Sequence, residues 1–186
     1  YELPYLDAAF GADREKPLLS LPPDSPEPAA FRDRASVFVL LYLPWLLVYL
    51  AFEFLGPFRG AVDVRFAFER DLPVLEWTEA VYVSVYLFMA LTPFLLKTKS
   101  EIRNFLLGGW VMCALGFFAF LTIPFIAPAR DFVSWSFWGA LINIERFCDS
   151  PATAFPAFHF AWPLLAAYSV GNSRGMKPLL LLYAAA

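Results

Sequence analysis

The sequence predicts an all-α membrane protein, folded as a polytopic bundle of transmembrane helices. Hydrophobic residues occupy 60% of its 186 positions, whereas ordinary soluble domains hold roughly 45–50%. Many of them gather in runs that approach the roughly 20 residues a helix needs to cross a bilayer. Lys and Arg total 14 against 17 Asp and Glu, so the chain has no overall basic charge with which to bind nucleic acid. We therefore expect membrane lipids, and no nucleic acid, around this protein.

Five apolar runs are expected to form the membrane-spanning segments. In chain order they cover residues 37–55, 80–96, 105–127 and 158–171, followed by a run that starts at residue 178 and reaches residue 186. The run at 158–171 is short and needs its flanking residues to reach both membrane faces. A helix that stopped inside a bilayer would leave backbone carbonyls unpaired. We therefore expect the natural polypeptide to continue past Ala186.

Proline and glycine residues are expected to affect the shape and the packing of these helices. Pro93 is expected to bend or end the second run, because proline removes a helical hydrogen bond. Gly108, Gly109 and Gly116 in the third run are expected to let a neighbouring helix approach closely. Cys113 and Cys148 lie far apart without a C-x-x-C partner. No part of the chain has the spacing of metal ligands, so we expect neither a metal ion nor a cofactor.

Residues 1–36 are polar and rich in proline, which predicts an extended tail before a transmembrane domain at 37–186. Basic residues near the spans are more numerous on one side of the predicted bundle than on the other. The first side carries Arg32, Arg34, Lys97, Lys99, Arg103, Arg174 and Lys177, and the second Arg59, Arg65, Arg70, Arg130 and Arg146. Because Lys and Arg near short loops favour the cytoplasm, we expect the tail there and His159 at the exoplasmic face of an inner, plasma or internal membrane.

A long aromatic loop joins the third run to the fourth. Its segment FVSWSFWGALI, residues 132–142, is expected to form an amphipathic helix in the membrane interface, where indole rings prefer to lie. Arg130 follows the third run and His159 precedes the fourth, so a packed bundle would bring both to one membrane surface. An arginine binds phosphate oxygens, and an imidazole transfers protons near neutral pH. The pair therefore indicates chemistry on a phosphate ester.

The stretch FPAFHFAWPLLAAY, residues 155–168, resembles the second signature motif, P-S-G-H, of the phosphatidic acid phosphatase type 2 (PAP2) superfamily. The resemblance is closest to the branch that includes inositol phosphorylceramide synthases. It implies about six transmembrane helices and a lipid phosphatase or phosphotransferase that acts on a lipid phosphate or phosphodiester at the exoplasmic face. It also implies that His159 is the general acid, that Pro156 forms the turn that fixes it, and that Arg130 binds phosphate.

The chain departs from the PAP2 pattern at several points. Ala157 stands where the motif has serine, and Phe158 where it has glycine. The second histidine of the family's mechanism is absent from these residues, since His159 is the only histidine among them. An enzyme is therefore expected if the chain continues past Ala186, and the missing histidine and its aspartate would lie there.

Other interpretations remain open at this point. The chain would alternatively be a non-catalytic transmembrane subunit of a larger complex, with a membrane protein as its partner. His159 would then only form a hydrogen bond at the interface, and Arg130 would only anchor a helix end. Glu53, near the end of the first run, is expected at the interface, although an acid within a span is a candidate functional group. A transporter is disfavoured because few charges lie inside the spans.

Overall fold

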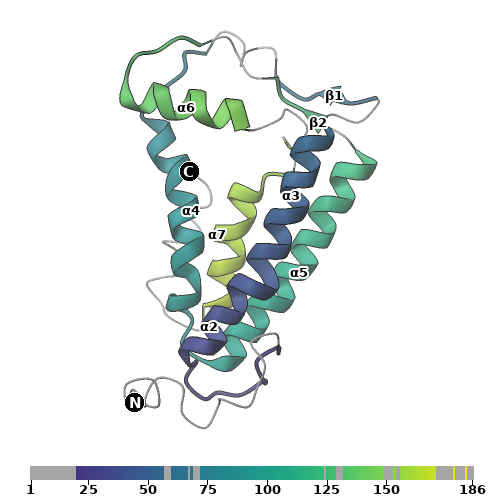
Figure 1. Ribbon diagram of the computed structural model, residues 1–186, viewed down its shortest axis with the longest axis vertical. Coiled ribbons are helices and arrows are strands. Elements are labelled where there is room, and N and C mark those ends of the chain that lie inside the picture. Colours follow the sequence, from purple (N-terminus) through teal and green to yellow (C-terminus); the bar gives the residue numbers. More distant parts are fainter. Residues whose placement is uncertain are drawn as a thin grey trace, which may run out of the picture.

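The computed structural model describes residues 20–56, 60–66, 68, 72–123, 125–128, 132–148, 153, 156–170, 178 and 183. Most of these residues are helical (Figure 1). The helices are α2 (Phe31–Val37), the π-helical turn η2 (Phe38–Tyr42), α3 (Leu43–Leu55), α4 (Thr78–Leu95), α5 (Lys99–Thr122), α6 (Phe137–Cys148) and α7 (Phe158–Ser169), and the strands are β1 (Val62–Asp63) and β2 (Phe125–Ile126). The predicted helical character is confirmed for the described part of the chain.

Three helical stretches are long and apolar enough to cross a membrane: Phe31–Leu55, Thr78–Leu95 and Lys99–Thr122. They correspond to the first three predicted spans. Large apolar side chains point outward from these helices, as expected of a surface that lipid tails cover. The exposed set includes Leu47, Leu87, Val111, Leu115, Phe118 and Leu121. Their number and spread indicate association with a membrane.

The other two predicted spans are only partly defined. The fourth corresponds to α7, which has 12 residues and is too short to cross a bilayer without its flanks. Of the fifth, only Pro178 and Tyr183 fall within the described residues. The hydroxyl of Tyr183 lies 2.5 Å from Ser84 Oγ of α4. A bundle of five or six spans therefore stays a prediction.

The first helix begins at Phe31, so residues 31–36 are helical and do not belong to an extended tail. A side chain of the first turn explains this start, because Asp33 Oδ2 accepts a hydrogen bond from the Ala30 amide at 2.8 Å. Arg34 then holds the helix to α4 by donating from Nη1 to the carbonyls of Pro93 and Leu96, at 2.5 and 2.6 Å. These carbonyls lie at the end of α4, where helical partners are lacking.

The described part of the tail is extended and lies along the connection between α4 and α5. The Ala29 amide donates to the Lys97 carbonyl at 2.8 Å, and the Lys99 amide to the Glu27 carbonyl at 3.0 Å. Lys99 also pairs with the Glu27 carboxylate at 2.8 Å. Residues 1–19 lie outside the described residues. The tail segment and the basic residues Lys97 and Lys99 thus share one end of the molecule, opposite α6 (Figure 1).

Two prolines inside the three long helical stretches leave backbone carbonyls without their helical donors. Pro44 has no N–H for the Leu40 carbonyl, and Pro93 has none for the Met89 carbonyl, because each proline lies four residues further along the helix. Side chains from neighbouring helices supply the missing donors. Trp110 Nε1 of α5 donates to the Leu40 carbonyl at 2.9 Å, and the Tyr42 hydroxyl donates to the Met89 carbonyl at 2.8 Å.

The glycines of α5 lie where other helices approach it, as predicted from the sequence. A Cβ added to Gly116 would lie 2.7 Å from Cζ of Phe158, and one added to Gly108 would lie 2.8 Å from Cδ1 of Leu165. Gly109 meets Leu41 of the first helix in the same way. α5 begins with a capping box in which Thr98 accepts from the Glu101 amide at 3.2 Å.

α5 ends at Thr122 and does not reach Ala127, as the third predicted span had it. Ile123 precedes a proline in the sequence and takes up φ −133° and ψ 76°, because the residue before proline avoids helical angles. The chain then forms β2, which pairs in parallel with β1. This pairing joins the connection after α3 to the connection after α5.

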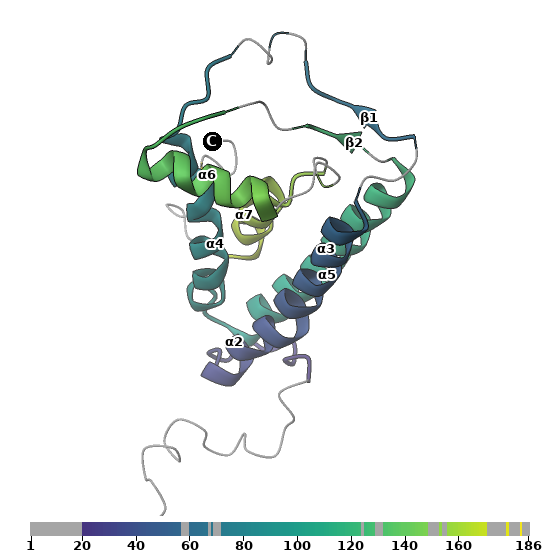
Figure 2. The same cartoon turned by 45° about the horizontal axis from the view of Figure 1, so that its top comes forward.

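α3 and α5 run side by side (Figures 1 and 2). The end of α4 that lies near α6 is separated from α3 and α5, whereas its other end lies closer to them. α7 packs against both α4 and α5 and occupies the space between them. The buried apolar residues come mainly from the first helix, α4, α5 and α7. The largest fully buried side chains include Trp162 of α7 and Phe105 and Phe120 of α5.

The pairing of Tyr42 with the Met89 carbonyl predicts a coupling to Pro93. Tyr42→Phe should lower the free energy of unfolding by about 1 kcal/mol, because the carbonyl loses its donor within a span. In a Pro93→Ala background a backbone N–H is available to Met89, and the cost should fall. Reversible unfolding in detergent measures both values, with Tyr168→Phe on the exposed face of α7 as the control. If Tyr42→Phe lowered the free energy of unfolding equally in the wild-type protein and in Pro93→Ala, the result would contradict the hydrogen bond between Tyr42 and the Met89 carbonyl.

Candidate functional site

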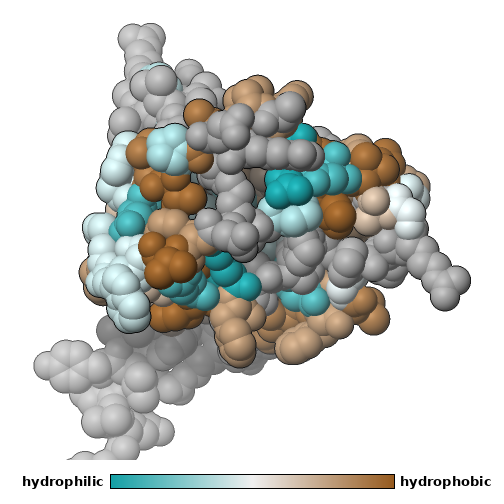
Figure 3. Space-filling model, turned by 90° about the horizontal axis from the view of Figure 1, so that it is seen from above, coloured by the Kyte–Doolittle hydropathy of each residue, from teal (hydrophilic) through white to brown (hydrophobic). Residues whose placement is uncertain are grey.

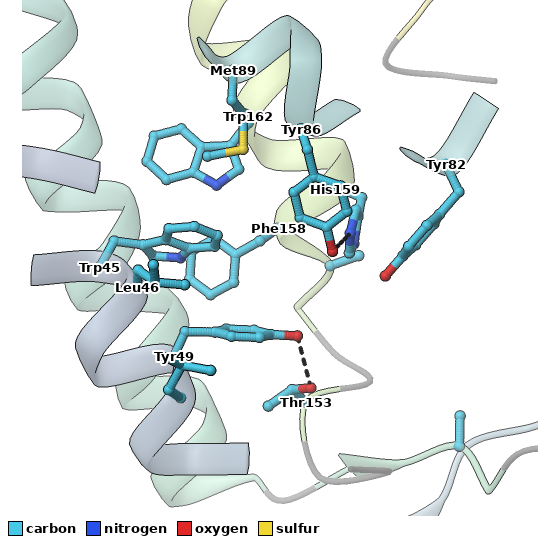
Figure 4. Close-up of a pocket in the computed structure, with 13 residues that line it drawn as sticks. Trp45, Leu46, Tyr49, Tyr82, Tyr86, Met89, Thr153, Phe158, His159 and Trp162 are labelled. Atoms are coloured by element: carbon cyan, nitrogen blue, oxygen red, sulfur yellow. Dashed lines mark hydrogen bonds between the residues drawn. The ribbon is translucent and has the colours of Figure 1, made fainter. Parts of the chain in front are cut away.

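A cavity of about 670 Å³ lies between α3, α4 and α7 (Figure 4). This volume is within the ~300–1,000 Å³ range of small-molecule sites. Its wall is largely aromatic and aliphatic and is formed by Trp45, Leu46, Tyr49, Leu50, Tyr82, Tyr86, Met89, Ala127, Thr153, Ala157, Phe158, His159 and Trp162. Its polar atoms belong to the hydroxyls of three tyrosines and Thr153, to two indole N–H groups and to the imidazole of His159.

The position of His159 follows from that of its neighbour Phe158. α7 begins at Phe158, with Ala157 as its N-cap and Pro156 in the bend before it. The ring of Phe158 is buried, 5.7 Å from the ring of Trp45 and 5.9 Å from that of Phe120. This anchor turns the next side chain, His159, away from α5 and toward α4. Two of the predicted motif residues, Ala157 and Phe158, therefore lie in the cavity wall with His159.

Two tyrosines of α4 hold the imidazole ring (Figure 4). The Tyr86 hydroxyl lies 3.2 Å from His159 Nε2, within hydrogen-bond distance. The ring of Tyr82 lies against the face of the imidazole, with centroids 4.0 Å apart and planes 33° from parallel. Tyr82 and Tyr86 are four residues apart, so they share one face of α4. Neither tyrosine was predicted as a site residue from the sequence, although both lie within the predicted second span, residues 80–96, at a spacing of four.

α6 is the amphipathic helix that the sequence predicted, but it covers Phe137–Cys148 and not residues 132–142. Its start is set by Ser136, whose Oγ accepts from the Gly139 amide at 2.9 Å as an N-cap does. Gly139 and Ile142 are buried, whereas Trp135 just before the helix is 98% exposed and Phe147 is 92% exposed. Figure 3 views this end of the molecule and shows hydrophobic residues beside hydrophilic ones, as expected of a membrane interface.

α6 contacts α4 through two acidic side chains. Glu76, just before α4, accepts a hydrogen bond from the Ser136 hydroxyl. Glu145 of α6 lies near the side chain of Tyr82, the residue whose ring lies on His159. Hydrogen bonds from Ser136, and then from Ser134, hold the pKa of Glu76 below its ordinary value. The interfacial helix is thus linked to the histidine through one tyrosine.

A second polar group lies across the cavity from His159. The Thr153 hydroxyl donates to Glu53 Oε1 at 2.5 Å and lies 3.1 Å from the Tyr49 hydroxyl. Glu53 therefore has a hydrogen-bond partner within the protein and is half-buried. This group brings the end of α3 to the segment that precedes α7.

Arg130, the predicted phosphate ligand, lies outside the described residues. Among the described residues, no cluster of three or more His, Cys, Asp or Glu side chains has the arrangement of a metal site. The described part of the site therefore contains one imidazole, several hydroxyls and an aromatic wall, and it lacks a cation placed for phosphate.

The fold and the site define a helical, membrane-associated protein with a histidine in the wall of an apolar cavity. Comparison of the chain with models of known protein families, with characterised proteins and with solved structures finds no match. The function must therefore be argued from the residues of the cavity.

The lowered pKa of Glu76 predicts an acid-sensitive start of α6. A carboxylate whose pKa is lower in the folded state stabilises its contact above the ordinary value of about 4.5 and loses this contribution as the pH falls through the folded value. Amide exchange at Gly139 and Ala140, corrected for intrinsic rates, should therefore rise as the pH is lowered below about 4.5. Glu76→Gln should remove this dependence, and a variant that retains it would contradict the assignment.

Proposed function

We propose that this protein is a membrane-embedded lipid phosphatase or phosphotransferase in which His159 is the general acid. The observation that carries the proposal is the placement of the chain's single histidine in the wall of an apolar cavity between α3, α4 and α7. An apolar cavity in a helical bundle is suited to the hydrocarbon part of a lipid. An imidazole beside a bound phosphate ester can transfer a proton to or from it. The resemblance of residues 155–168 to the PAP2 motif assigns this role to the same side chain.

In this proposal the lipid phosphate lies beside His159. The imidazolium gives its proton to the oxygen that leaves phosphorus, so that the P–O bond breaks and a neutral alcohol departs. The imidazole then takes a proton from the water or acceptor alcohol that attacks phosphorus in the second step. The PAP2 resemblance assigns the first attack on phosphorus to a second histidine, and it assigns phosphate binding to Arg130.

Tyr86 and Tyr82 support this role by fixing the imidazole ring. The hydrogen bond at Nε2 sets the rotation of the ring in its plane, and the stacked face of Tyr82 sets the plane itself. A catalytic proton donor must be held close to its productive geometry, because small displacements reduce the rate strongly. Both tyrosines are positioning residues in this proposal.

The alternative function is that of a non-catalytic transmembrane subunit. Ala157 favours it, because this residue has no hydroxyl to donate to phosphate where the motif has serine. Stable co-purification of a partner, together with a lack of turnover by the complete protein, would support this alternative.

The proposal predicts that His159 is required for turnover. The complete natural polypeptide is reconstituted in vesicles with phosphatidic acid, and with phosphatidylinositol for the phosphodiester case, and released phosphate or headgroup is measured. His159→Gln should lower kcat by about 10²- to 10⁴-fold, the usual contribution of acid–base catalysis. Phe160→Leu, at the exposed neighbouring position, is the control. Turnover that persists in His159→Gln at the unaltered rate would reject the proposal.

Tyr86→Phe should lower kcat by about three- to tenfold with KM within twofold, since a single hydrogen bond to the proton donor is lost. The structural readout is the imidazole nitrogen spectrum of protein labelled with ¹⁵N-histidine, in which the Nε2 resonance of His159 should move. Tyr168→Phe on the outer face of α7 is the control. An unmoved Nε2 resonance would contradict the hydrogen bond.

A further inference from the structure

We propose that the tail segment, residues 20–30, and Arg34 together form a clamp that sets how far α4 stands from α3 across the cavity. The clamp lies at the end of the molecule opposite α6, and the cavity lies further along the same helices (Figure 1). The inference concerns the width of the cavity, so it goes beyond the proposed function and does not depend on the reaction.

The tail segment is joined to the connection between α4 and α5 by a short antiparallel ladder. Pro28 pairs with Thr98, between the two backbone hydrogen bonds described above. The Ser100 amide extends the ladder by donating to the Ser25 carbonyl at 3.0 Å. Because antiparallel hydrogen bonds fix both the position and the direction of a chain, the tail segment holds this connection in one place.

Side chains add to the ladder where the tail segment passes the start of α5. Ser100 Oγ donates to Asp24 Oδ1 at 2.6 Å. The ion pair between Lys99 and Glu27 lies beside it, with 14% of the lysine side chain and 66% of the glutamate side chain exposed. Leu21 packs against the buried core. The tail segment is therefore bound both to the connection and to the first turn of α5.

Arg34 joins the tail segment to the last turn of α4. Its Nη1 donates to the carbonyls of Pro93 and Leu96, and its Nη2 donates to the Ala29 carbonyl at 3.5 Å. Arginine suits this position, because its guanidinium carries five donors in a rigid fork. A single side chain of the first helix thus holds the end of α4 and the tail segment together.

Beyond the clamp, α4 diverges from α3. The two helices lie closer together at the end where the clamp is and separate toward α6 (Figures 1 and 2). The cavity lies within this angle, since α4 contributes Tyr82, Tyr86 and Met89 to its wall and α3 contributes Trp45 and Tyr49. The width of the cavity therefore depends on the angle between α3 and α4.

The length of α4 makes this width sensitive to the clamp. Tyr82 lies 11 residues before Pro93, which is about 16 Å along a helix axis. A rotation of α4 by about 10° at its clamped end would therefore move Tyr82 by about 3 Å. A displacement of this size is larger than a hydrogen bond tolerates. The contacts of α4 with His159 thus require that the clamped end stays in place.

The test measures the separation of α4 from α3 by double electron–electron resonance between two spin labels. The complete natural polypeptide, with Cys113→Ala and Cys148→Ala, is labelled at Phe54→Cys on α3 and Val83→Cys on α4 and reconstituted in vesicles. A second pair, Phe54→Cys and Leu121→Cys, reports the distance between α3 and α5, which run side by side. All three labelled positions are exposed, so the labels leave the core intact.

Arg34→Gln should shift or widen the distribution of α3–α4 distances by about 2–3 Å, as the rotation above gives. Glu27→Lys should do so to a smaller extent, because like charges would then face each other at Lys99. Combining Glu27→Lys with Lys99→Glu restores the ion pair with its charges exchanged and should return the distances to those of the unaltered clamp. The control is Lys97→Gln, which removes a positive charge from an exposed position in the same connection.

The α3–α5 distance should remain unchanged in every variant. An unchanged α3–α4 distance in both Arg34→Gln and Glu27→Lys would overturn the inference. An equal change of the α3–α5 distance would also overturn it, because the whole bundle would then have loosened. If Arg34→Gln does not fold, Glu27→Lys and its charge-exchanged partner decide, since the Glu27 side chain is largely exposed.

Discussion

Hydrogen bonding of backbone carbonyls inside the bilayer is the constraint on which the rest of this structure depends. Lipid tails offer no donor, so each carbonyl that a proline frees must be bonded by another part of the protein. Trp110 donates a hydrogen bond to the Leu40 carbonyl, and Tyr42 donates one to the Met89 carbonyl. Each of these bonds joins two helices at a fixed depth. The prolines therefore determine how the first helix, α4 and α5 are held together, and with them the walls of the cavity.

The short helix α7 completes the cavity. Phe158 and Trp162 are buried against rings from the first helix and α5, and Gly116 leaves the space that Phe158 fills. Because of this packing, His159 lies on the face of α7 that meets α4. There its imidazole contacts the side chains of Tyr82 and Tyr86. The same anchor that stabilises α7 thus sets the position of the imidazole in the cavity wall.

The sequence was sufficient for the features that depend on local patterns. Hydropathy located three long helices, the spacing of glycines identified the close contacts of α5, and the aromatic loop contained an amphipathic helix. The sequence was insufficient for two helix starts, which local capping side chains set, and for most of the residues around His159. Asp33 extends the first helix back to Phe31, and Ser136 moves the start of α6 to Phe137. In the site, the motif located His159, but Tyr82, Tyr86 and Trp45 lie on other helices and reach the cavity only through helix packing.

The most direct test of the central claim, that His159 meets a lipid phosphate in this cavity, is its rate of modification by diethyl pyrocarbonate, read by mass spectrometry of the peptide that contains it. The complete protein in vesicles is treated with and without phosphatidic acid, and diacylglycerol serves as the matched lipid without phosphate. The account predicts that phosphatidic acid slows the modification of His159 and that diacylglycerol slows it much less. Equal rates with and without phosphatidic acid would contradict it.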